Sequence, residues 1–562
     1  MFKTLTEMLL RRAEAIPDAL FVRFVQQGNV VGAYTYSQTW TWATQWAWTL
    51  LGRGVRRGDR VVLALPNSDD FVGAYLGALL CGAIPAPIAP FREIAAADSY
   101  ASLVSQRVRL LDAHVLVVPE EQANMAALSH LSDINPLTLI SRRDLEPGVR
   151  PIPPDGSEAD LALLLFTSGT TGDAKVVQLS HAALLAQTRN ISEHLKLVDP
   201  SVDWAVSWLP LYYDMGLIGF LLTPIYPGGH VTLLRTEDFI LRPSLWVKAL
   251  SQFRASITGG PPSAYALCAR FTRDSEVERC ELGRVRIALV GAEAIWPQSL
   301  EPFVRKFRPA GFRATSLLAT YGLAEAGSAV TMTRLDQGTD FDLINPESMR
   351  ATGITRSTGG GSPLNGPTRP VASLGPPIPQ MEVAIISEAG ERLPERQIGE
   401  VVVRGPTLMQ GYYAQPEASR QALQDGGLRT GDLGYLAGGK LYITGRKQEL
   451  ITVGGRNYHP EDLEQVVRER LGVRGGRAVA IGCEGREQGS GAAVVLVETA
   501  LTAPAERDAL RQQVHHVLLE AGYTVSQVVL LRPKVIRNTP NGKLRRVDCK
   551  VRYLAGEFAA DN

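Results

Sequence analysis

Short apolar runs alternate with longer segments of helical periodicity through roughly the first 440 residues of the chain. Residues 60–65, 115–118, 231–234 and 287–290 have the length and composition of buried strands. Residues 241–253 have the apolar spacing of an amphipathic helix. Strands that alternate with helices form parallel sheets covered by helices, so we expect an α/β fold of layered subdomains here.

The pattern changes near residue 371, where short strands separated by turns begin. The segments that combine an apolar stretch with Gly or Pro are 381–394, 399–406 and 439–445. They are typical of a β-rich subdomain. After Arg446 the chain returns to mixed elements, with a helix expected at 460–471 and strands at 478–481 and 493–497. We therefore expect a smaller α+β unit at the C-terminal end.

Residues 351–370 stand apart because Gly, Ser, Thr and Pro dominate them. Such a composition cannot bury enough apolar surface to offset the entropy of ordering, so this segment is expected to lack regular structure. A mobile surface loop is the simpler interpretation, and a functional insertion is the alternative.

The composition is that of a globular protein with several domains. The 562 residues suggest three or four units at about 150 residues each. The net charge of +1 provides no long-range attraction to nucleic acid or to an anionic membrane. We therefore expect no nucleic-acid partner.

The cysteines and the N-terminal segment bear on the compartment. The five cysteines show no CxxC pairing, so neither a zinc site nor a disulfide framework is indicated. The N-terminal segment carries charges throughout, unlike a signal peptide, and no apolar run approaches the ~18 residues that span a bilayer. These features predict a cytoplasmic protein without stable membrane insertion.

The segment 163–181 carries the strongest chemical signal. An apolar run leads directly into Thr167, Ser168, Gly169, Thr170, Thr171 and Gly172, and Lys175 follows. Small residues let backbone N–H groups close around a phosphate, and the lysine supplies positive charge. A plain surface loop is the alternative, but the apolar approach and the lysine favour phosphate binding. Asp173 follows Gly172, so the Gly-Lys-Ser/Thr of a Walker A loop is missing, and the loop predicts a nucleoside triphosphate bound outside the P-loop fold.

Four further motifs follow in order along the chain. Glu325 ends the segment ATYGLAE and is a candidate Mg²⁺ ligand, although a lone glutamate at a turn is often only solvated. Asp432 ends RTGD, where a carboxylate on a turn can accept both ribose hydroxyls. Residues 442–449 form a polar turn that can act as a hinge. Lys543 projects from a Pro/Asn/Gly turn, which suits a movable charge better than a structural lysine.

In their order and spacing these motifs resemble the adenylate-forming superfamily of acyl-CoA synthetases, peptide-synthetase adenylation domains and luciferases. The resemblance covers essentially the whole chain. It is closest to fatty acyl-AMP ligases, through residues 207–219, 256–265, 291–293 and 455–460. The family implies a large N-terminal domain and a small, mobile C-terminal domain.

The resemblance implies a two-step reaction that uses ATP and Mg²⁺. The carboxylate of an acid attacks the α-phosphate of ATP, giving acyl-AMP and pyrophosphate, and a thiol then captures the acyl group. In fatty acyl-AMP ligases this thiol is the phosphopantetheine arm of an acyl carrier protein, in lipid, polyketide or nonribosomal peptide biosynthesis. These ligases carry an insertion, here about 347–370, that disfavours free CoA. We expect a fatty or medium-chain acid as the substrate.

The resemblance also implies roles for individual residues. Lys543 would bridge the carboxylate and the α-phosphate, Thr167 would share in catalysis, and Glu325 would hold Mg²⁺. Asp432 and Arg446 would hold the ribose. The remaining implied nucleotide-binding residues are Ser168, Gly169, Thr170, Thr171, Gly172, Lys175, Gly291, Ala292, Glu293, Tyr321, Gly322, Leu323 and Ala324.

Further implied features concern the acyl pocket and the movement of the C-terminal domain. The implied pocket residues are Tyr213, Asp214, Met215 and Gly216. Gln448 is implied to be the hinge residue, within a hinge at 444–449 that joins an N-terminal domain (1–443) to a C-terminal lid (450–562). Rotation of the lid would withdraw Lys543 before the thiol arrives.

Several positions depart from the family pattern and leave alternatives open. Tyr213 replaces a histidine at the acyl pocket, and Gln448 stands where Asp or Lys is usual. Asp214 is interpreted as structural, although in amino-acid-activating relatives a nearby aspartate pairs with the substrate ammonium. The alternatives are adenylation of an amino acid or aryl acid for a carrier protein, an acyl-CoA synthetase that uses free CoA, and a catalytically silent sensor.

Overall fold

A computed structural model describes residues 2–91, 97–123, 137–146, 150, 152–167, 175–199, 201–355, 357, 368–453, 456–471, 477–484, 491–537 and 544–558. The largest sheet has eight strands in the order β14-β13-β12-β11-β9-β10-β1-β2. Their bounds are β1 Leu20–Gln26, β2 Asn29–Thr35, β9 Trp204–Ser207, β10 His230–Leu234, β11 Ile257–Gly260, β12 Ile287–Val290, β13 Leu317–Leu323 and β14 Ser328–Met332. The six inner strands run parallel, and β2 and β14 close the two edges in antiparallel pairing.

Three further sheets complete the N-terminal part of the chain, with a short pair beside them. A parallel sheet has the order β4-β3-β5-β6, and the antiparallel sheets are β19-β8-β7 and β17-β18-β21-β20, with β22 on β21. The bounds are β3 Arg60–Leu63, β4 Ile84–Pro87, β5 Val115–Val117, β6 Thr138–Ile140, β7 Leu161–Phe166, β8 Val176–Ser180, β17 Glu382–Ile386, β18 Gly399–Arg404, β19 Gly411–Tyr412, β20 Leu423–Gln424, β21 Gly427–Ala437 and β22 Lys440–Arg446, with β15 Phe341–Ile344 pairing β16 Arg369–Ala372. The predicted layered α/β subdomains and the β-rich subdomain are therefore confirmed.

Helices pack among the sheets of the N-terminal part of the chain. They are α1 Leu5–Ala15, α2 Tyr36–Gly52, α3 Asp69–Leu80, α4 Ala97–Leu111, α6 His181–His194, α7 Thr236–Leu241, α8 Ser244–Gln252, α9 Pro262–Phe271, α10 Asp274–Val277, α11 Pro297–Phe307, α12 Pro346–Thr352 and α13 Pro416–Ala422. The prediction of a single helix over residues 241–253 is wrong at its start, because α7 ends at Leu241 and the next helix, α8, begins only at Ser244. Pro243 lies between them, and proline lacks the N–H that a continuous helix would need.

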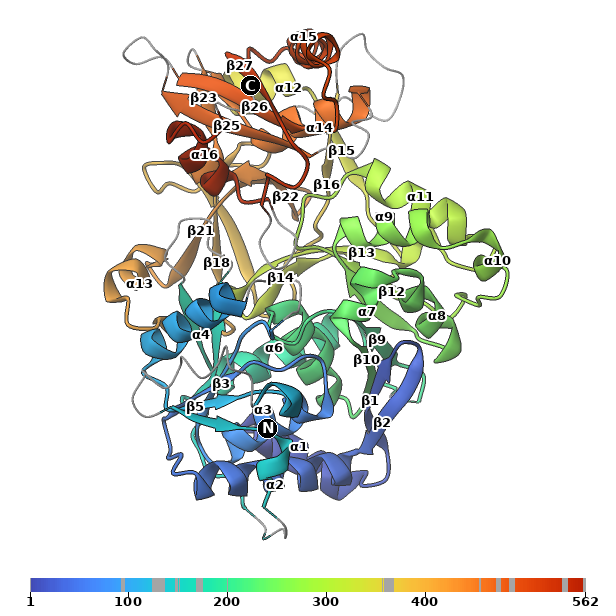
Figure 1. Ribbon diagram of the computed structural model, residues 1–562, viewed down its shortest axis with the longest axis vertical. Coiled ribbons are helices and arrows are strands. Elements are labelled where there is room, and N and C mark those ends of the chain that lie inside the picture. The colour runs from blue at the N-terminus through green and yellow to red at the C-terminus, as the bar shows by residue number, and fades with distance from the viewer. Residues whose placement is uncertain are drawn as a thin grey trace.

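The C-terminal elements form a unit of their own at one end of the molecule (Figure 1). They are β23 Ile451–Val453, β24 Arg456–Tyr458, α14 Pro460–Leu471, β25 Ala478–Glu484, β26 Gly491–Glu498, α15 Pro504–Glu520, β27 Gln527–Leu531 and α16 Arg546–Leu554. Two apolar clusters fill this unit, separate from the large core of the N-terminal domain. The protein thus has a large N-terminal domain and a small α+β C-terminal domain.

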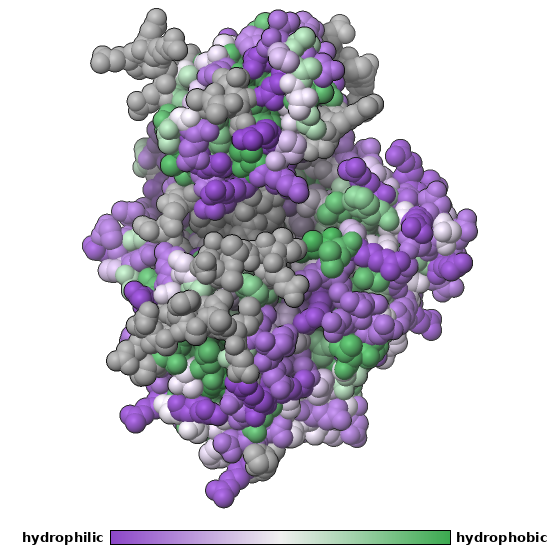
Figure 2. Space-filling model, viewed as in Figure 1, coloured by the Kyte–Doolittle hydropathy of each residue, from purple (hydrophilic) through white to green (hydrophobic). Residues whose placement is uncertain are grey.

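Residues 356 and 358–367 of segment 351–370 lie outside the described residues, so the expectation that this segment lacks regular structure stays a prediction. Residues 351–352 end α12, and residues 369–370 begin β16. On the face shown in Figure 2, hydrophilic residues predominate and the hydrophobic patches are small and separate. None of the helices in the described ranges combines the length and apolar character needed to cross a membrane.

Candidate active site

Three of the predicted nucleotide-binding residues meet between the eight-stranded sheet and the β-rich sheet of the N-terminal domain. Tyr321, near the end of β13, donates a 2.6 Å hydrogen bond from its hydroxyl to Oδ2 of Asp432 on β21. Asp432 pairs across the strands with Arg446 on β22, whose Nε lies 3.0 Å from Oδ1. Asp432 is 5% exposed, whereas the Arg446 side chain is half exposed. We name these three residues the Asp432 cluster.

The electrostatics of the Asp432 cluster preserve its hydrogen bonds. Burial, together with the Asp432 carboxylate, raises the pKa of Tyr321 well above its usual value. The same carboxylate raises the pKa of Arg446. Tyr321 therefore stays a donor and Arg446 stays cationic at physiological pH. The expectation that Asp432 lies on a turn is wrong, because Asp432 belongs to an extended strand whose register with β22 sets the ion pair.

A second polar group forms around Tyr412, a residue that the sequence motifs did not single out. Tyr412 lies on β19, and its hydroxyl donates a 2.9 Å hydrogen bond to Oε1 of Glu325. Glu325 lies in the 3₁₀ turn η7 (Ala324–Ala326) directly after β13. The Nζ atom of Lys175 lies 4.8 Å from the centroid of the Tyr412 ring, within the range of a cation–π contact. We name Lys175, Tyr412 and Glu325 the Tyr412 cluster.

Strand pairing explains why Tyr412 lies there. Tyr412 on β19 pairs with Val177 on β8, two residues after Lys175. Thr167, at the end of β7, donates its backbone N–H to the carbonyl of Lys175 at 2.9 Å. The two ends of the predicted phosphate loop are thus held together, while Ser168, Gly169, Thr170, Thr171 and Gly172 lie outside the described residues.

The two clusters meet at the end of β13, because Tyr321 and Glu325 are four residues apart. Between them Gly322 passes so close to the carbonyl of Ser328 that a Cβ atom would collide with it. Gly322 is exposed, and Leu323 and Ala324 are partly exposed, on the segment that connects the clusters. This close approach of β13 and β14 fixes the spacing between the Asp432 cluster and the Tyr412 cluster.

The predicted adenine segment follows β12, the neighbour of β13 in the main sheet. Gly291 is buried beside Thr320, and Ala292 is exposed with a positive φ of 67°. Glu293 accepts hydrogen bonds from the hydroxyl and the backbone N–H of Ser263, at 3.0 and 3.3 Å. Ser263, at the start of α9, belongs to the segment 256–265 that carries the family resemblance, but nothing local in the sequence indicates its contact with residue 293.

The predicted acyl-pocket residues lie at the start of another element that packs on the main sheet. Tyr213 and Asp214 are partly buried and immediately precede η4, a π-helix spanning Met215–Leu222. Gly216 is required by a close approach, because a Cβ there would collide with the carbonyl of Pro210. The η4 helix contacts β14, the strand that follows Glu325. The predicted acyl-pocket residues therefore lie at the beginning of an element that packs against β14 of the main sheet.

The predicted hinge residue Gln448 is exposed in a 3₁₀ turn, η8 (Lys447–Glu449). Its neighbour Glu449 accepts an ion pair from Arg546 at 2.6 Å, and Glu464 pairs with Arg546 at 2.8 Å. Arg546 begins α16, three residues after Lys543. Lys543 itself lies outside the described residues. These ion pairs connect the end of the predicted hinge and helix α14 to the start of α16, which follows Lys543 closely in the sequence.

The acidic residues fit a Mg²⁺ ion that is shared with a substrate. Within the described ranges no group of three His, Cys, Asp or Glu side chains could hold a metal ion. One carboxylate oxygen of Glu325 accepts the hydrogen bond from the Tyr412 hydroxyl, and the Nζ atom of Lys175 lies over the Tyr412 ring. Mg²⁺ is commonly held by one or two carboxylates with substrate phosphates and water. A single glutamate beside a phosphate-binding lysine suits that arrangement.

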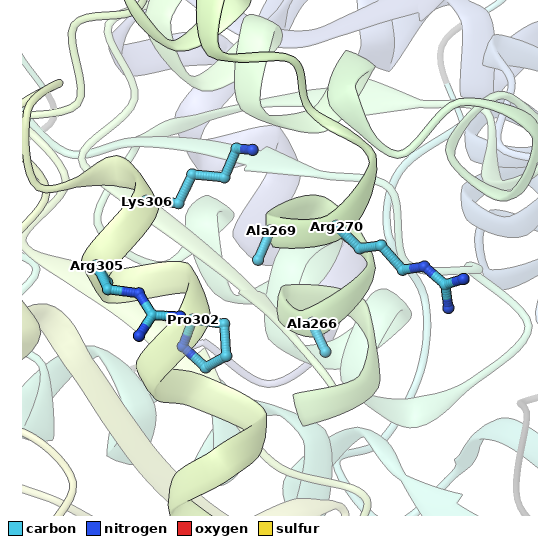
Figure 3. Close-up of a pocket in the computed structure, with 6 residues that line it drawn as sticks. All are labelled: Ala266, Ala269, Arg270, Pro302, Arg305 and Lys306. Carbon is cyan, nitrogen blue, oxygen red and sulfur yellow. The ribbon is translucent and has the colours of Figure 1, made fainter. Parts of the chain in front are cut away.

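A separate cavity of about 490 Å³ lies between α9 and α11 (Figure 3). Its lining residues are Ala266, Ala269, Arg270, Pro302, Arg305 and Lys306. None of the residues in the two clusters lines it. We therefore place the candidate active site at the end of β13 and not in this cavity, because the end of β13 gathers residues that the sequence predicts to bind a nucleotide.

The chain is similar to known proteins over most of its length. A family model described as AMP-binding enzyme matches residues 9–413. A Caulobacter vibrioides protein, named provisionally as an acyl-CoA synthetase, is 33% identical over 540 residues, covering 95% of this chain and 92% of its own. The medium-chain fatty acid–acyl-carrier-protein ligase JamA of Moorena producens is 28% identical, covering 99% and 96%.

A solved structure from work on fatty acyl-adenylate ligases of E. coli and L. pneumophila matches with a TM-score of 0.90 and 28% identity, covering 100% of this chain and 98% of that one. The fold and the site define an adenylate-forming ligase, which activates a carboxylic acid as its acyl-AMP. The chain belongs to the AMP-binding enzyme family, whose members use ATP.

Proposed function

We propose that the protein adenylates a fatty or medium-chain carboxylic acid and passes the acyl group to the phosphopantetheine thiol of an acyl carrier protein. The observation that carries this proposal is the meeting of the Asp432 cluster and the Tyr412 cluster at the end of β13. One cluster suits a ribose, and the other suits phosphates. The similarity to fatty acyl-adenylate ligases and to JamA supports the class of acid and the acceptor.

On the ribose side, the buried Asp432 carboxylate accepts hydrogen bonds from the hydroxyl groups of the sugar. Its orientation is held by Tyr321 and Arg446, so the carboxylate needs no reorganisation when the nucleotide binds. Gly291, Ala292 and Glu293 form the wall beside the adenine, and the contact between Ser263 and Glu293 holds that wall.

On the phosphate side, Lys175 and the loop from Thr167 neutralise the triphosphate, and Glu325 holds Mg²⁺ when it is bound. The ion supplies charge that screens the phosphates from the attacking carboxylate. Tyr412 orients the Glu325 oxygen and supports Lys175 with its ring. Lys543 joins the site from the C-terminal domain and bridges the carboxylate and the α-phosphate.

The proposed reaction has two steps. A carboxylate oxygen of the acid forms a bond to the α-phosphorus, the bond from that phosphorus to the bridging oxygen breaks, and pyrophosphate leaves. The thiol sulphur then attacks the acyl carbon, its proton passes to solvent, and AMP leaves with the oxygen that joined it to the acyl group.

We propose that the N-terminal domain spans residues 1–443, the hinge 444–449 and the C-terminal domain 450–562. Rotation at Gln448 separates the two steps of the reaction.

The test is pyrophosphate release from ATP and Mg²⁺ across fatty, aryl and amino acids, first without any thiol. Release with medium or long fatty acids is the expected result. Acyl transfer is then compared between free CoA and a phosphopantetheinylated carrier protein, and the proposal requires the carrier to be preferred. Release only with amino or aryl acids would overturn the choice of acid, and efficient thioester formation with CoA would overturn the choice of acceptor.

A further inference from the structure

One arginine near the candidate active site is not used by either cluster. Arg107 lies on α4 and is partly buried. Its guanidinium carbon is 4.3 Å from the centroid of the Phe166 ring. Phe166 is the last residue of β7 and directly precedes Thr167, where the predicted phosphate loop begins. Arg107 is therefore held against the base of that loop.

The same helix also interacts with residues at and beside the predicted acyl pocket. Arg107 interacts electrostatically with Tyr213, and Tyr100 on the same helix interacts with Tyr212. The rings of Tyr212 and Tyr213 are 4.7 Å apart. Arg107 thus lies between the segment that precedes the phosphate loop and the segment that begins the acyl pocket.

The guanidinium of Arg107 has an unused donor. Its Nη1 atom is inaccessible to solvent and has no hydrogen-bond partner. No carboxylate in the described ranges forms an ion pair with Arg107, whereas other buried arginines have one: Arg369 pairs with Asp462 at 2.7 Å, and Arg286 with Asp203 at 2.6 Å. A buried charge without a partner is costly, and proteins keep such groups where a ligand completes them.

We propose that Arg107 is a substrate-binding residue whose Nη1 atom donates to anionic oxygens between Phe166, at the end of β7, and Tyr213, the first of the predicted acyl-pocket residues. The planar guanidinium matches the spacing of oxygens in a carboxylate or a phosphate. The contact with the Phe166 ring holds that plane in place. The source of the oxygens is either the carboxylate of the acid or a phosphate of ATP and pyrophosphate. The inference rests on the adenylation chemistry proposed above.

The experiment compares Arg107→Met and Arg107→Lys with Arg109→Met, an exposed arginine on the same helix. The Michaelis constants for the acid and for ATP and the inhibition by inorganic pyrophosphate are measured by pyrophosphate release and exchange. Arg107→Met is expected to weaken the binding of either the acid or the phosphate-containing ligands by about tenfold or more. Arg107→Lys is expected to recover part of the loss, and Arg109→Met to have no effect.

The pattern of loss identifies the ligand. If only the Michaelis constant for the acid rises, the group that Arg107 binds is the carboxylate of the acid. If the Michaelis constant for ATP and the inhibition constant for pyrophosphate rise, Arg107 binds phosphate oxygens. The melting temperature without ligand should stay equal or rise in Arg107→Met, because the variant removes an uncompensated buried charge. A lower melting temperature with unchanged constants, or no change in either, would overturn the proposal.

A separate readout keeps this inference distinct from the proposed function. Thermal stabilisation by ATP with Mg²⁺, by pyrophosphate and by a fatty acid is measured for the wild type and for Arg107→Met. Absence of pyrophosphate release from the wild type with every acid would contradict the proposed function. Equal stabilisation of wild type and variant by all three ligands would contradict the role of Arg107.

Discussion

The Tyr412 hydroxyl donates a 2.9 Å hydrogen bond to the Glu325 carboxylate. The two residues are far apart in the sequence, and they meet because β19 pairs with β8 next to the end of β13. Burial and the Glu325 carboxylate together raise the pKa of Tyr412, so its phenol remains a donor. One side chain therefore orients the predicted Mg²⁺ ligand and supports the predicted phosphate-binding lysine.

Replacing Tyr412 by Phe should separate these two roles. The variant keeps the ring beneath Lys175 but removes the hydrogen bond to Glu325, so the Mg²⁺ concentration needed for half-maximal pyrophosphate release should rise, and the rate should fall about tenfold. Tyr413→Phe is the matched control, because the Tyr413 hydroxyl bonds only the Leu111 carbonyl, at 3.3 Å. An unchanged Mg²⁺ dependence in Tyr412→Phe would show that Glu325 needs no such orientation.

Replacing Asp432 by Asn should weaken nucleotide binding. The variant retains the shape of the side chain but loses the charge that Arg446 and the Tyr321 hydroxyl share. The Michaelis constant for ATP should rise by roughly 10- to 100-fold, with a smaller change in that for the acid. Steady-state kinetics of pyrophosphate release provide the measurement, with the exposed Asp425→Asn as control. A change confined to the constant for the acid would contradict a role in holding the ribose.

Replacing Lys543 by Ala should impair adenylation selectively. Loss of a charge that bridges the carboxylate and the α-phosphate commonly costs about 10²- to 10³-fold in rate. Transfer from supplied acyl-AMP to a carrier thiol should remain, since the proposed rotation of the C-terminal domain withdraws the lysine in that step. The exposed Lys550→Ala is the control. Adenylation at the wild-type rate in Lys543→Ala would remove this residue from the catalytic machinery.

Replacing Arg546 by Met should destabilise the C-terminal domain. Arg546 is 15% exposed and pairs with Glu449 and Glu464, whose side chains are 7% and 3% exposed. Its removal leaves buried carboxylates uncompensated, at a cost of about 3–5 kcal/mol in the free energy of unfolding. Urea unfolding measures the loss. Arg537→Met, with a 61% exposed side chain, should change stability by less than about 1 kcal/mol.

Protonation of His181 should make the protein less stable in mild acid. His181 is buried and its Nδ1 accepts the Leu5 N–H at 3.1 Å, and burial lowers its pKa to about 4. Between that pH and about 6.5 the unfolded chain binds a proton that the folded protein excludes, so stability falls as the pH falls through this window. The contribution is on the order of 2 kcal/mol between pH 7 and pH 4.5.

The variant His181→Asn tests this assignment. Its unfolding free energy should depend less on pH than that of the wild type over the same window, while the exposed His516→Asn should follow the wild type. Identical pH dependence in the wild type and His181→Asn would show that other groups cause the loss in acid.

Local chemistry explains what could be predicted from the sequence. The strands at 287–290 and 493–497 and the helix at 460–471 follow from apolar periodicity, which acts over neighbouring residues. The α/β architecture and the family follow from the order of such segments and motifs. The split between α7 and α8 also has a local cause in Pro243, which the reading of 241–253 as one helix overlooked.

Only the tertiary structure decided which side chains share a site. The ion pair of Asp432 with Arg446 depends on the register of β21 and β22, and the position of Tyr412 depends on the pairing of β19 with β8. The burial of Arg107 against Phe166 depends on the packing of α4 over β7. Such contacts arise from the burial of apolar surfaces that are distant along the chain, so no local pattern of residues specifies them.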